Sequence, residues 1–469
     1  MGIRSLRRRV MALALATTLG AGTLAGCANP DAGKPGKPDN KLTVWSLENL
    51  PPRMAATKKV VDRFERDTGI EVELVGVSEG QLPQMVMSAA AAGELPDVIG
   101  AVPMGQVWQM YGNDLLNTEA AAEVVAALGP DTFNDNALRL TSDGDRNLSV
   151  PSDAWLQLLL YRKDLFAEAG LPTPDSYREV TRAARRFDRD GRVGISLATD
   201  PGDVFTQQSF ESLALANDCQ LVGPDDEVAL DSPACRTAFA TYDELARRYG
   251  APGAQTVDST RATYFAGRSG MLVWSSFVLD ELAGLRKDAL PSCPACRQAP
   301  SWLADHTGIV TALRGPDSDE PAQYGEISSW AITRTAEIEA SKTFVHYMLD
   351  AGYRDWFGMA PEGKIPVRNG TAEDPTRFAR AWRASEMGVD TRRPMQEVFS
   401  DTLLDQLHDG ITNMKRWGIA EGHGALVGAT NGALPVPRVV GAMTSGQTTP
   451  EEAAREADAE VTALKTSLQ

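Results

Sequence analysis

"KLTVWSL" (residues 41–47), "IEVELVGV" (70–77) and "PDVIGAV" (96–102) are the three segments that decide the fold. Each is short and rich in β-branched and apolar side chains, which is typical of a β-strand. The third is almost wholly apolar, as expected of a strand in a parallel sheet that helices cover on both faces. The three segments are therefore predicted to be strands of one buried sheet.

The two connections between these strands are predicted to be helices. Val60, Val61 and Phe64 recur at helical spacing in the first connection. Gly69 follows as a stop signal. Residues 81–92, "QLPQMVMSAAAA", form the second helix and are followed by a glycine. A β-α-β-α-β order at the start of a chain predicts an α/β fold built on a doubly wound sheet.

Residues 1–26 are predicted to be a signal peptide. Four arginines precede the apolar run 10–21, which is too short to span a bilayer as a permanent helix. Leu24-Ala25-Gly26-Cys27 then resembles the bacterial lipobox. In that signal the cysteine is diacylated and becomes the mature N-terminus, so the resemblance implies lipidation of Cys27. An ordinary secreted protein and an uncleaved anchor are the alternatives.

Residues 27–40 are expected to be a flexible tether, because they are rich in Pro, Gly, Asp and Lys and show no apolar periodicity. The globular part then begins at Lys41. No later apolar segment reaches eighteen residues, so a second membrane span is not expected.

The chain of 469 residues is acidic. Its net charge is −17, and loss of the four arginines in residues 1–26 would take it to −21. Such acidity argues against nucleic acid as a partner, since phosphate binding needs a basic face. The structured part exceeds what one hydrophobic core normally serves, so two lobes are expected.

If Cys27 carries lipid, four cysteines remain: Cys219, Cys235, Cys293 and Cys296. An even number in an exported protein indicates two disulfides, and three pairings are possible. Local closure favours Cys219–Cys235 and Cys293–Cys296. A thioredoxin-like role for the "CPAC" motif is the sharper alternative, but prolines flank it where a helix should begin. A zinc site would need a second such motif.

Signals for catalysis, a metal or a cofactor are weak. The four histidines lack HExxH spacing, and neither a G-x-S-x-G elbow nor a Walker A loop is present. "DRDGR" at 188–192 lacks the remaining ligands of a calcium loop and is better explained as a hairpin turn. Pairs of acids, as in glycoside hydrolases, are expected by chance in so acidic a chain. No enzymatic activity, metal or cofactor is expected.

Seven segments form an ordered series along the chain: "AAAAGELPDVIGA" (89–101), "DGDRNLSVP" (143–151), "LYRKDLFAEAGLPTPDSYREV" (160–180), "FAGRSGMLVW" (265–274), "WAITRTAEIEASKTFVHYMLD" (330–350), "GKIPVRNG" (363–370) and "SGQTTPEEAAREADAEV" (445–461). Taken together and in this order, they resemble the extracellular solute-binding proteins of bacterial ABC importers (family 1, the sugar and oligosaccharide branch). Arg162 stands where that family usually has Asn, and Gly270 where it has Ala.

The resemblance implies a two-lobed, type II periplasmic-binding-protein-like fold with a ligand in the cleft between doubly wound lobes. Crossings between the lobes are expected near Pro151, Gly325–Ser329 and Asp374. Lobe 1 would then comprise 41–151 plus 330–374, and lobe 2 would comprise 152–329 plus 375–469.

The function implied is capture of a sugar, preferentially an oligosaccharide, by a monomeric lipoprotein. The protein would be anchored at the extracytoplasmic face of the cell membrane and would deliver its ligand to the permease of an ABC importer. A non-sugar solute on the same fold (a glycerophosphodiester, a peptide or a polyamine) is one alternative. A secreted carbohydrate-active enzyme is the other.

A sugar offers C–H faces that pack on aromatic rings and a hydroxyl rim that forms hydrogen bonds. Candidate residues are therefore aromatic, acidic and hydroxyl side chains near the carboxyl ends of strands or near the expected crossings. They are Glu48, Trp108, Tyr111, Asp153, Trp155, Trp274, Ser275, Glu326, Ser329, Trp330 and Trp417.

Overall fold

The computed structural model describes residues 40–468. The predicted signal peptide, the lipidation site Cys27 and the tether up to residue 39 lie outside the described residues. Within residues 40–468, none of the helices is both long enough and apolar enough to cross a membrane.

The β-α-β-α-β opening is confirmed. It consists of β1 (Lys41–Ser46), α1 (Pro51–Thr68), β2 (Glu71–Gly76), α2 (Leu82–Ala92) and β3 (Val98–Pro103). Strand β1 pairs in parallel with both β2 and β3. Helix α1 ends at Gly69, whose φ of 74° lies in the left-handed region that glycine adopts without strain.

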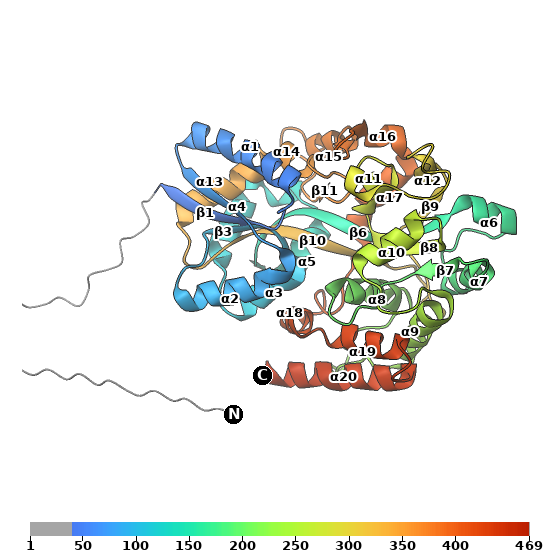
Figure 1. Ribbon diagram of the computed structural model, residues 1–469. Coiled ribbons are helices and arrows are strands. Elements are labelled where there is room, and N and C mark those ends of the chain that lie inside the picture. The colour runs from blue at the N-terminus through green and yellow to red at the C-terminus, as the bar shows by residue number, and fades with distance from the viewer. Residues whose placement is uncertain (1–39, 469) are drawn as a thin grey trace, which may run out of the picture. The chain divides into compact units, whose positions relative to one another are not determined.

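Two long strands, β6 (Val150–Arg162) and β10 (Gln323–Ile332), join the two ends of the sheet. The hydrogen-bonded order is β2-β1-β3-β10-β6-β8-β7. The first half of β6 pairs with β10. Its second half pairs with β8 (Ser269–Ser275) and β9 (Thr307–Val310), and β7 (Val193–Ser196) pairs in parallel with β8. We call the two ends the β1–β3 layer and the β7–β9 layer (Figure 1).

Two of the three crossings predicted from the resemblance, near Pro151 and near Gly325–Ser329, fall inside these two shared strands. The third, near Asp374, falls in the loop that follows β11 (Ile365–Pro366), which itself pairs with β6. We propose these positions as the lobe boundaries.

Helices surround both layers (Figure 1). Around the β1–β3 layer lie α1, α2, α3 (Met104–Gly112), α4 (Thr118–Leu128), α5 (Asp135–Leu140), α13 (Ile338–Leu349) and α14 (Tyr353–Phe357). The remaining helices are α6 (Lys163–Ala169), α7 (Tyr177–Phe187), α8 (Val204–Ala216), α9 (Pro233–Asp243), α10 (Val257–Phe265), α11 (Val278–Leu282), α12 (Trp302–Asp305), α15 (Arg377–Arg383), α16 (Met395–Val398), α17 (Asp401–Asn413), α18 (Gly424–Ala433), α19 (Pro435–Thr444) and α20 (Pro450–Ser467). Short strands are β4 (Ser142–Asp143), β5 (Arg146–Asn147), β12 (Glu386–Met387), β13 (Arg393–Pro394) and β14 (Met414–Lys415).

The structure pairs Cys219 with Cys235 and Cys293 with Cys296, which are the local pairings that the sequence favoured. The first disulfide ties the segment after α8 to α9, and all four cysteines are buried. Helices α8 and α9 therefore carry a covalent constraint beside the β7–β9 layer.

Removal of the first disulfide should destabilise the protein more than removal of the second. In the chain-entropy model, a loop closed across 16 positions contributes about 3 kcal/mol, and one closed across 3 positions contributes about 2 kcal/mol. Unfolding of Cys219→Ala/Cys235→Ala and Cys293→Ala/Cys296→Ala in urea would measure both losses. A larger loss for the second pair would contradict this ranking.

Candidate ligand-binding cavity

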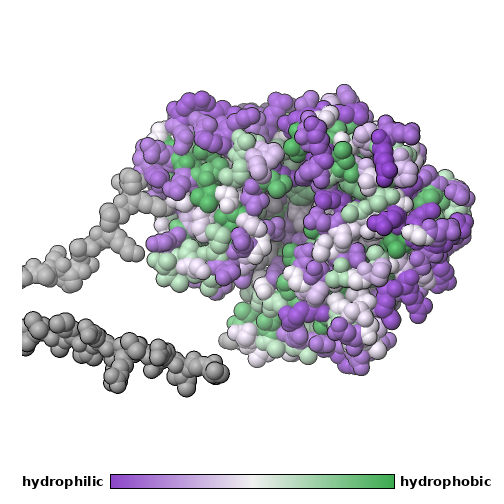
Figure 2. Space-filling view, viewed as in Figure 1, coloured by the Kyte–Doolittle hydropathy of each residue, from purple (hydrophilic) through white to green (hydrophobic). Residues whose placement is uncertain are grey.

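A cavity of about 790 Å³ lies where the β1–β3 layer meets the β7–β9 layer. Figure 2 shows a hollow near the centre of a mainly hydrophilic surface. Its wall is formed by the loop after β1, the 3₁₀ turn Glu79–Gln81, the start of α3, strands β6, β8 and β10, and helices α8, α10 and α11. The volume is typical of sites for small molecules.

Strand β10 forms the floor of the cavity, and side chains two positions apart on a strand lie on the same face. Tyr324, Glu326 and Ser328 are two positions apart and all line the cavity. On the adjacent strand β6, Trp155 stands directly opposite Glu326 in the register and also lines it. The floor thus combines a hydroxyl, a carboxylate and two aromatic rings.

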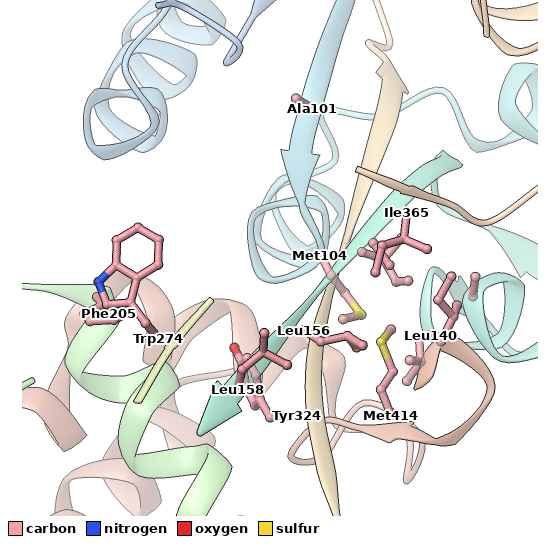
Figure 3. Close-up of a cluster of buried hydrophobic side chains, with 14 of the residues drawn as sticks. Ala101, Met104, Leu140, Leu156, Leu158, Phe205, Trp274, Tyr324, Ile365 and Met414 are labelled. Carbon is pink, nitrogen blue, oxygen red and sulfur yellow. The ribbon is translucent and has the colours of Figure 1, made fainter. Parts of the chain in front are cut away.

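Two pairs of aromatic rings, on four different elements, contribute to the apolar part of the wall. Trp274 of β8 packs against Phe205 of α8 with ring centroids 5.9 Å apart, and its Nε1 donates to the Val257 carbonyl at 3.0 Å. Figure 3 shows these two rings together, apart from Tyr324 on β10. Trp155 and Tyr324 form a second pair at 6.0 Å. Since ring packing and a hydrogen bond hold Trp274 in place, its ring presents a preorganised surface to a ligand.

Glu48 lines the cavity, but a buried lysine and a partly exposed arginine already hold its carboxylate. Lys364 Nζ lies 2.8 Å from Glu48 Oε1 and 2.9 Å from Asp153 Oδ2. Arg53 donates to Glu48 Oε2 at 2.8 Å. Burial alone would raise the pKa of Glu48, but Lys364 and Arg53 outweigh it and lower that pKa to about 2.

Glu326 is held in the same way. Its Oε1 accepts from the Met104 backbone N–H at 2.9 Å, and its Oε2 lies 2.5 Å from Arg416, which also lies 3.1 Å from Glu211. Burial nevertheless keeps the pKa of Glu326 above its ordinary value, although Arg416 opposes the shift. Arg416 also lies over the Tyr324 ring, 4.8 Å from its centroid.

A third ionic cluster lies beside Trp274. Glu281 of α11 pairs with Arg261 and Arg286, each at 2.9 Å. Arg261 also pairs with Asp258 at 2.8 Å and lies 5.7 Å from the Trp274 ring centroid. Burial raises the pKa of Glu281 despite both arginines. Paired charges therefore frame the aromatic surface.

Five of the eleven residues expected from the sequence line the cavity, and the other six do not. The five are Glu48, Trp155, Trp274, Ser275 and Glu326. The six that lie away from its wall are Trp108, Tyr111, Asp153, Ser329, Trp330 and Trp417.

Trp330 lies in the core because β10 is irregular at this point. The register of β10 shifts between Ser328 and Ser329 against β6, and between Ser329 and Ala331 against β3. This interrupts the alternation that brings Tyr324, Glu326 and Ser328 to the cavity. Trp330 is fully buried against Trp356, and Ser329 is fully buried as well.

Packing explains the other displaced residues. Trp108 is buried where α3 meets α18, with its ring against Gly424. Tyr111 is partly exposed at the surface, and its hydroxyl donates to Asp143 Oδ2 at 2.9 Å. Trp417 is buried, and its Nε1 donates to the Cys219 carbonyl at 2.8 Å. Asp153 is buried in the network of Lys364 described above.

Other residues of the wall were missed by sequence reasoning, although two signals would have found several of them. Tyr324 follows from Glu326 by strand alternation. Glu79 and Asp203 come after β2 and β7, at strand ends where open α/β sheets bind ligands. Arg416 carried no such signal, since it precedes Trp417 in an irregular segment.

Among residues 40–468, no group of three or more His, Cys, Asp or Glu side chains is arranged to hold a metal ion.

The chain is similar to known proteins both in sequence and in fold. The model of the family described as bacterial extracellular solute-binding protein matches residues 48–355. A protein of Escherichia coli (strain K12) named "Putative ABC transporter periplasmic-binding protein YcjN" is 28% identical over 333 residues, which are 69% of this chain and 72% of that protein.

Two solved structures show the same fold. The ABC transporter solute-binding protein of Agrobacterium radiobacter K84, in complex with ribitol, has a TM-score of 0.69 at 18% identity, covering 90% of this chain and 98% of that one. The maltose-bound MalE3 of T. maritima has a TM-score of 0.68 at 17% identity, covering 90% and 99%. The chain thus has the two-lobed, type II fold that was expected from the sequence.

Proposed function

Since the chain belongs to the bacterial extracellular solute-binding protein family, we propose that it captures a sugar, preferably an oligosaccharide, in its cavity and releases it unchanged to an ABC permease. The observation that carries this proposal is the composition of the cavity wall. Trp155 and Trp274 offer flat aromatic surfaces, and Gln109, Gln208 and Asn431 offer amides beside them. This combination suits the C–H faces and the hydroxyl rim of a sugar.

The ligands of the similar structures support the same chemistry, because ribitol and maltose both carry many hydroxyl groups. Closure of the two lobes on the ligand would follow from contacts that bridge both layers and so favour the closed state. We further propose that residues 1–26 direct export and that lipid on Cys27 holds the protein, as a monomer, at the extracytoplasmic face of the membrane.

The proposal is tested by a thermal-shift screen of the chain beginning at residue 28, with monosaccharides, sugar alcohols, oligosaccharides, peptides, glycerophosphodiesters and polyamines. A ligand at 100 times its Kd should add about 2.7 kcal/mol to the free energy of unfolding. The incubated ligand should be recovered intact by chromatography. Stabilisation by a peptide or a glycerophosphodiester alone would contradict a sugar ligand, and turnover would contradict a binding role.

Loss of either cavity tryptophan should weaken binding. Trp155→Ala and Trp274→Ala each remove an aromatic surface that contributes about 1 kcal/mol or slightly more, so Kd should rise about tenfold. Isothermal titration calorimetry would measure the change. Trp302→Ala is the matched control, because Trp302 is partly exposed, stacks on His306 and lies away from the cavity wall. An equal loss in the control would argue against this assignment.

A further inference from the structure

The charges of the cavity wall are unequal. Six carboxylates (Glu48, Glu79, Asp203, Asp258, Glu281 and Glu326) face four guanidinium groups, and the wall contains neither Lys nor His. Each of those guanidinium groups is already paired with a carboxylate. The wall is therefore negative overall, and it offers an anionic ligand no unpaired cation.

Glu79 and Asp203 are the two acids of the wall that have no Lys, Arg or His within ion-pair distance in the part of the chain the structure describes. Glu79 begins the 3₁₀ turn after β2, beside the β1–β3 layer. Asp203 precedes α8, on the opposite side of the cavity, and its Oδ1 accepts from the Phe205 backbone N–H at 3.0 Å. Both residues line the same cavity.

Three buried polar atoms on the same wall also lack a partner. Within residues 40–468, the Tyr324 hydroxyl, Gln207 Oε1 and Gln106 Oε1 have no hydrogen-bond partner. Tyr324 is 2% exposed and Gln207 is 3% exposed. Buried polar groups without partners are costly, and a polar ligand in the cavity would supply those partners.

Resting on the sugar-binding function proposed above, we propose that the ligand is an amino sugar whose protonated amine binds between Glu79 and Asp203. Both carboxylates accept charge-assisted hydrogen bonds from the amine, and its positive charge relieves their mutual repulsion across the cavity. Trp155 and Trp274 then pack on the sugar rings. Because the amine bridges the two sides, its binding also favours lobe closure.

The ionisation of Glu79 should make the affinity for an amino sugar depend on pH. The Glu79 side chain is exposed on the cavity wall. Desolvation by the surrounding protein, and then repulsion from the negative charges of Glu326, Glu48 and Asp203, nevertheless raises the pKa of Glu79 to about 7. An ammonium group binds the deprotonated carboxylate. Affinity for an amino sugar should therefore rise about tenfold between pH 5.5 and pH 7, where the amine itself stays protonated.

The test is calorimetric titration with matched pairs: glucosamine and glucose, galactosamine and galactose, and glucosamine oligosaccharides with glucose oligosaccharides of equal length and linkage. The amino member should bind at least tenfold more tightly, and N-acetylation should remove the difference. Glu79→Gln should abolish both the preference and the pH dependence. Asp203→Asn should reduce the preference while keeping the helix cap, since Asn also caps helices. Glu94→Gln, an exposed acid outside the cavity, should change nothing.

Each outcome separates this inference from the function on which it rests. Equal binding of neutral and amino sugars, unaffected by Glu79→Gln, would overturn the inference and leave sugar capture standing. Spermidine is titrated in parallel, and its binding without binding of any sugar would overturn both the amino sugar and the sugar function. Failure of every neutral and amino sugar to bind the folded protein would also overturn both.

Discussion

Lys364→Met should lower the free energy of unfolding by about 3–5 kcal/mol, because it leaves two carboxylates buried without their shared cation. Lys364 is fully buried between Glu48 and Asp153, and its Nζ lies 4.3 Å from the Trp356 ring centroid. Asp153 also accepts from Trp356 Nε1 at 2.7 Å. One cation thus joins the loop after β1 to strand β6. Urea unfolding followed by circular dichroism would measure the loss.

The matched control is Lys58→Met, which breaks an exposed ion pair with Asp62 one helical turn away. Such pairs contribute only about 0.3–0.5 kcal/mol. Lys364→Met/Glu48→Gln/Asp153→Asn should recover part of the loss, since it removes the charges that were left unpaired. If Lys364→Met destabilises no more than the control, the buried network does not stabilise this region.

The contribution of the Lys364 network to the free energy of unfolding should depend on pH. The folded-state pKa of Glu48, about 2, is lower than its ordinary value of 4.5. Its contribution to stability is therefore complete above pH 4.5 and is lost as the pH falls towards 2. The difference in stability between the wild type and Lys364→Met should accordingly be largest at neutral pH and should shrink in acid.

Trp330→Ala should also cost about 3–5 kcal/mol, because it empties a large and fully buried site in the core. The Trp330 ring lies 4.6 Å from that of Trp356 and 5.6 Å from that of Phe344, centroid to centroid. It also covers Gly100, where a Cβ would lie only 2.4 Å from the ring. The midpoint of urea unfolding should fall, while the Kd of the folded protein for its ligand should stay unchanged.

Trp330→Phe distinguishes core packing from ligand contact. It keeps most of the volume and removes Nε1, which has no hydrogen-bond partner within residues 40–468. Its cost should therefore stay below about 1.5 kcal/mol. Trp155→Ala should behave in the opposite way, since this partly exposed ring lines the cavity. Weakened binding in Trp330→Phe without loss of stability would instead make Trp330 a ligand contact.

The fold was predictable because its signals are local. Alternating or continuous apolar residues in 41–47, 70–77 and 96–102 predict strands whatever they later contact, and Gly69 ends its helix through its own backbone freedom. The local disulfide pairings follow from short loops in the same way. These features depend on neighbours along the chain.

The cavity was predictable only in part, because a residue's type does not tell which side of its element faces the ligand. Glu326 and Trp330 are four positions apart on one strand, so regular alternation would place both side chains on the same face. An irregularity between them instead places Glu326 at the cavity and Trp330 in the core. Arg416 and Trp417 are adjacent, and the arginine lines the cavity while the tryptophan packs beside Cys219.

By itself, the sequence determined the α/β class, the order of the first strands and helices, and the presence of tryptophans and acids suited to a polar ligand. Which of these side chains come into contact depends on the folded arrangement of the chain. It gave Lys364 two carboxylate partners that lie 316 and 211 residues away along the chain. It also placed Glu79 and Asp203 on the wall of one cavity, each without a Lys, Arg or His within ion-pair distance among residues 40–468. The physical reason is that charge pairing and burial depend on distance in space, which separation along the chain does not set.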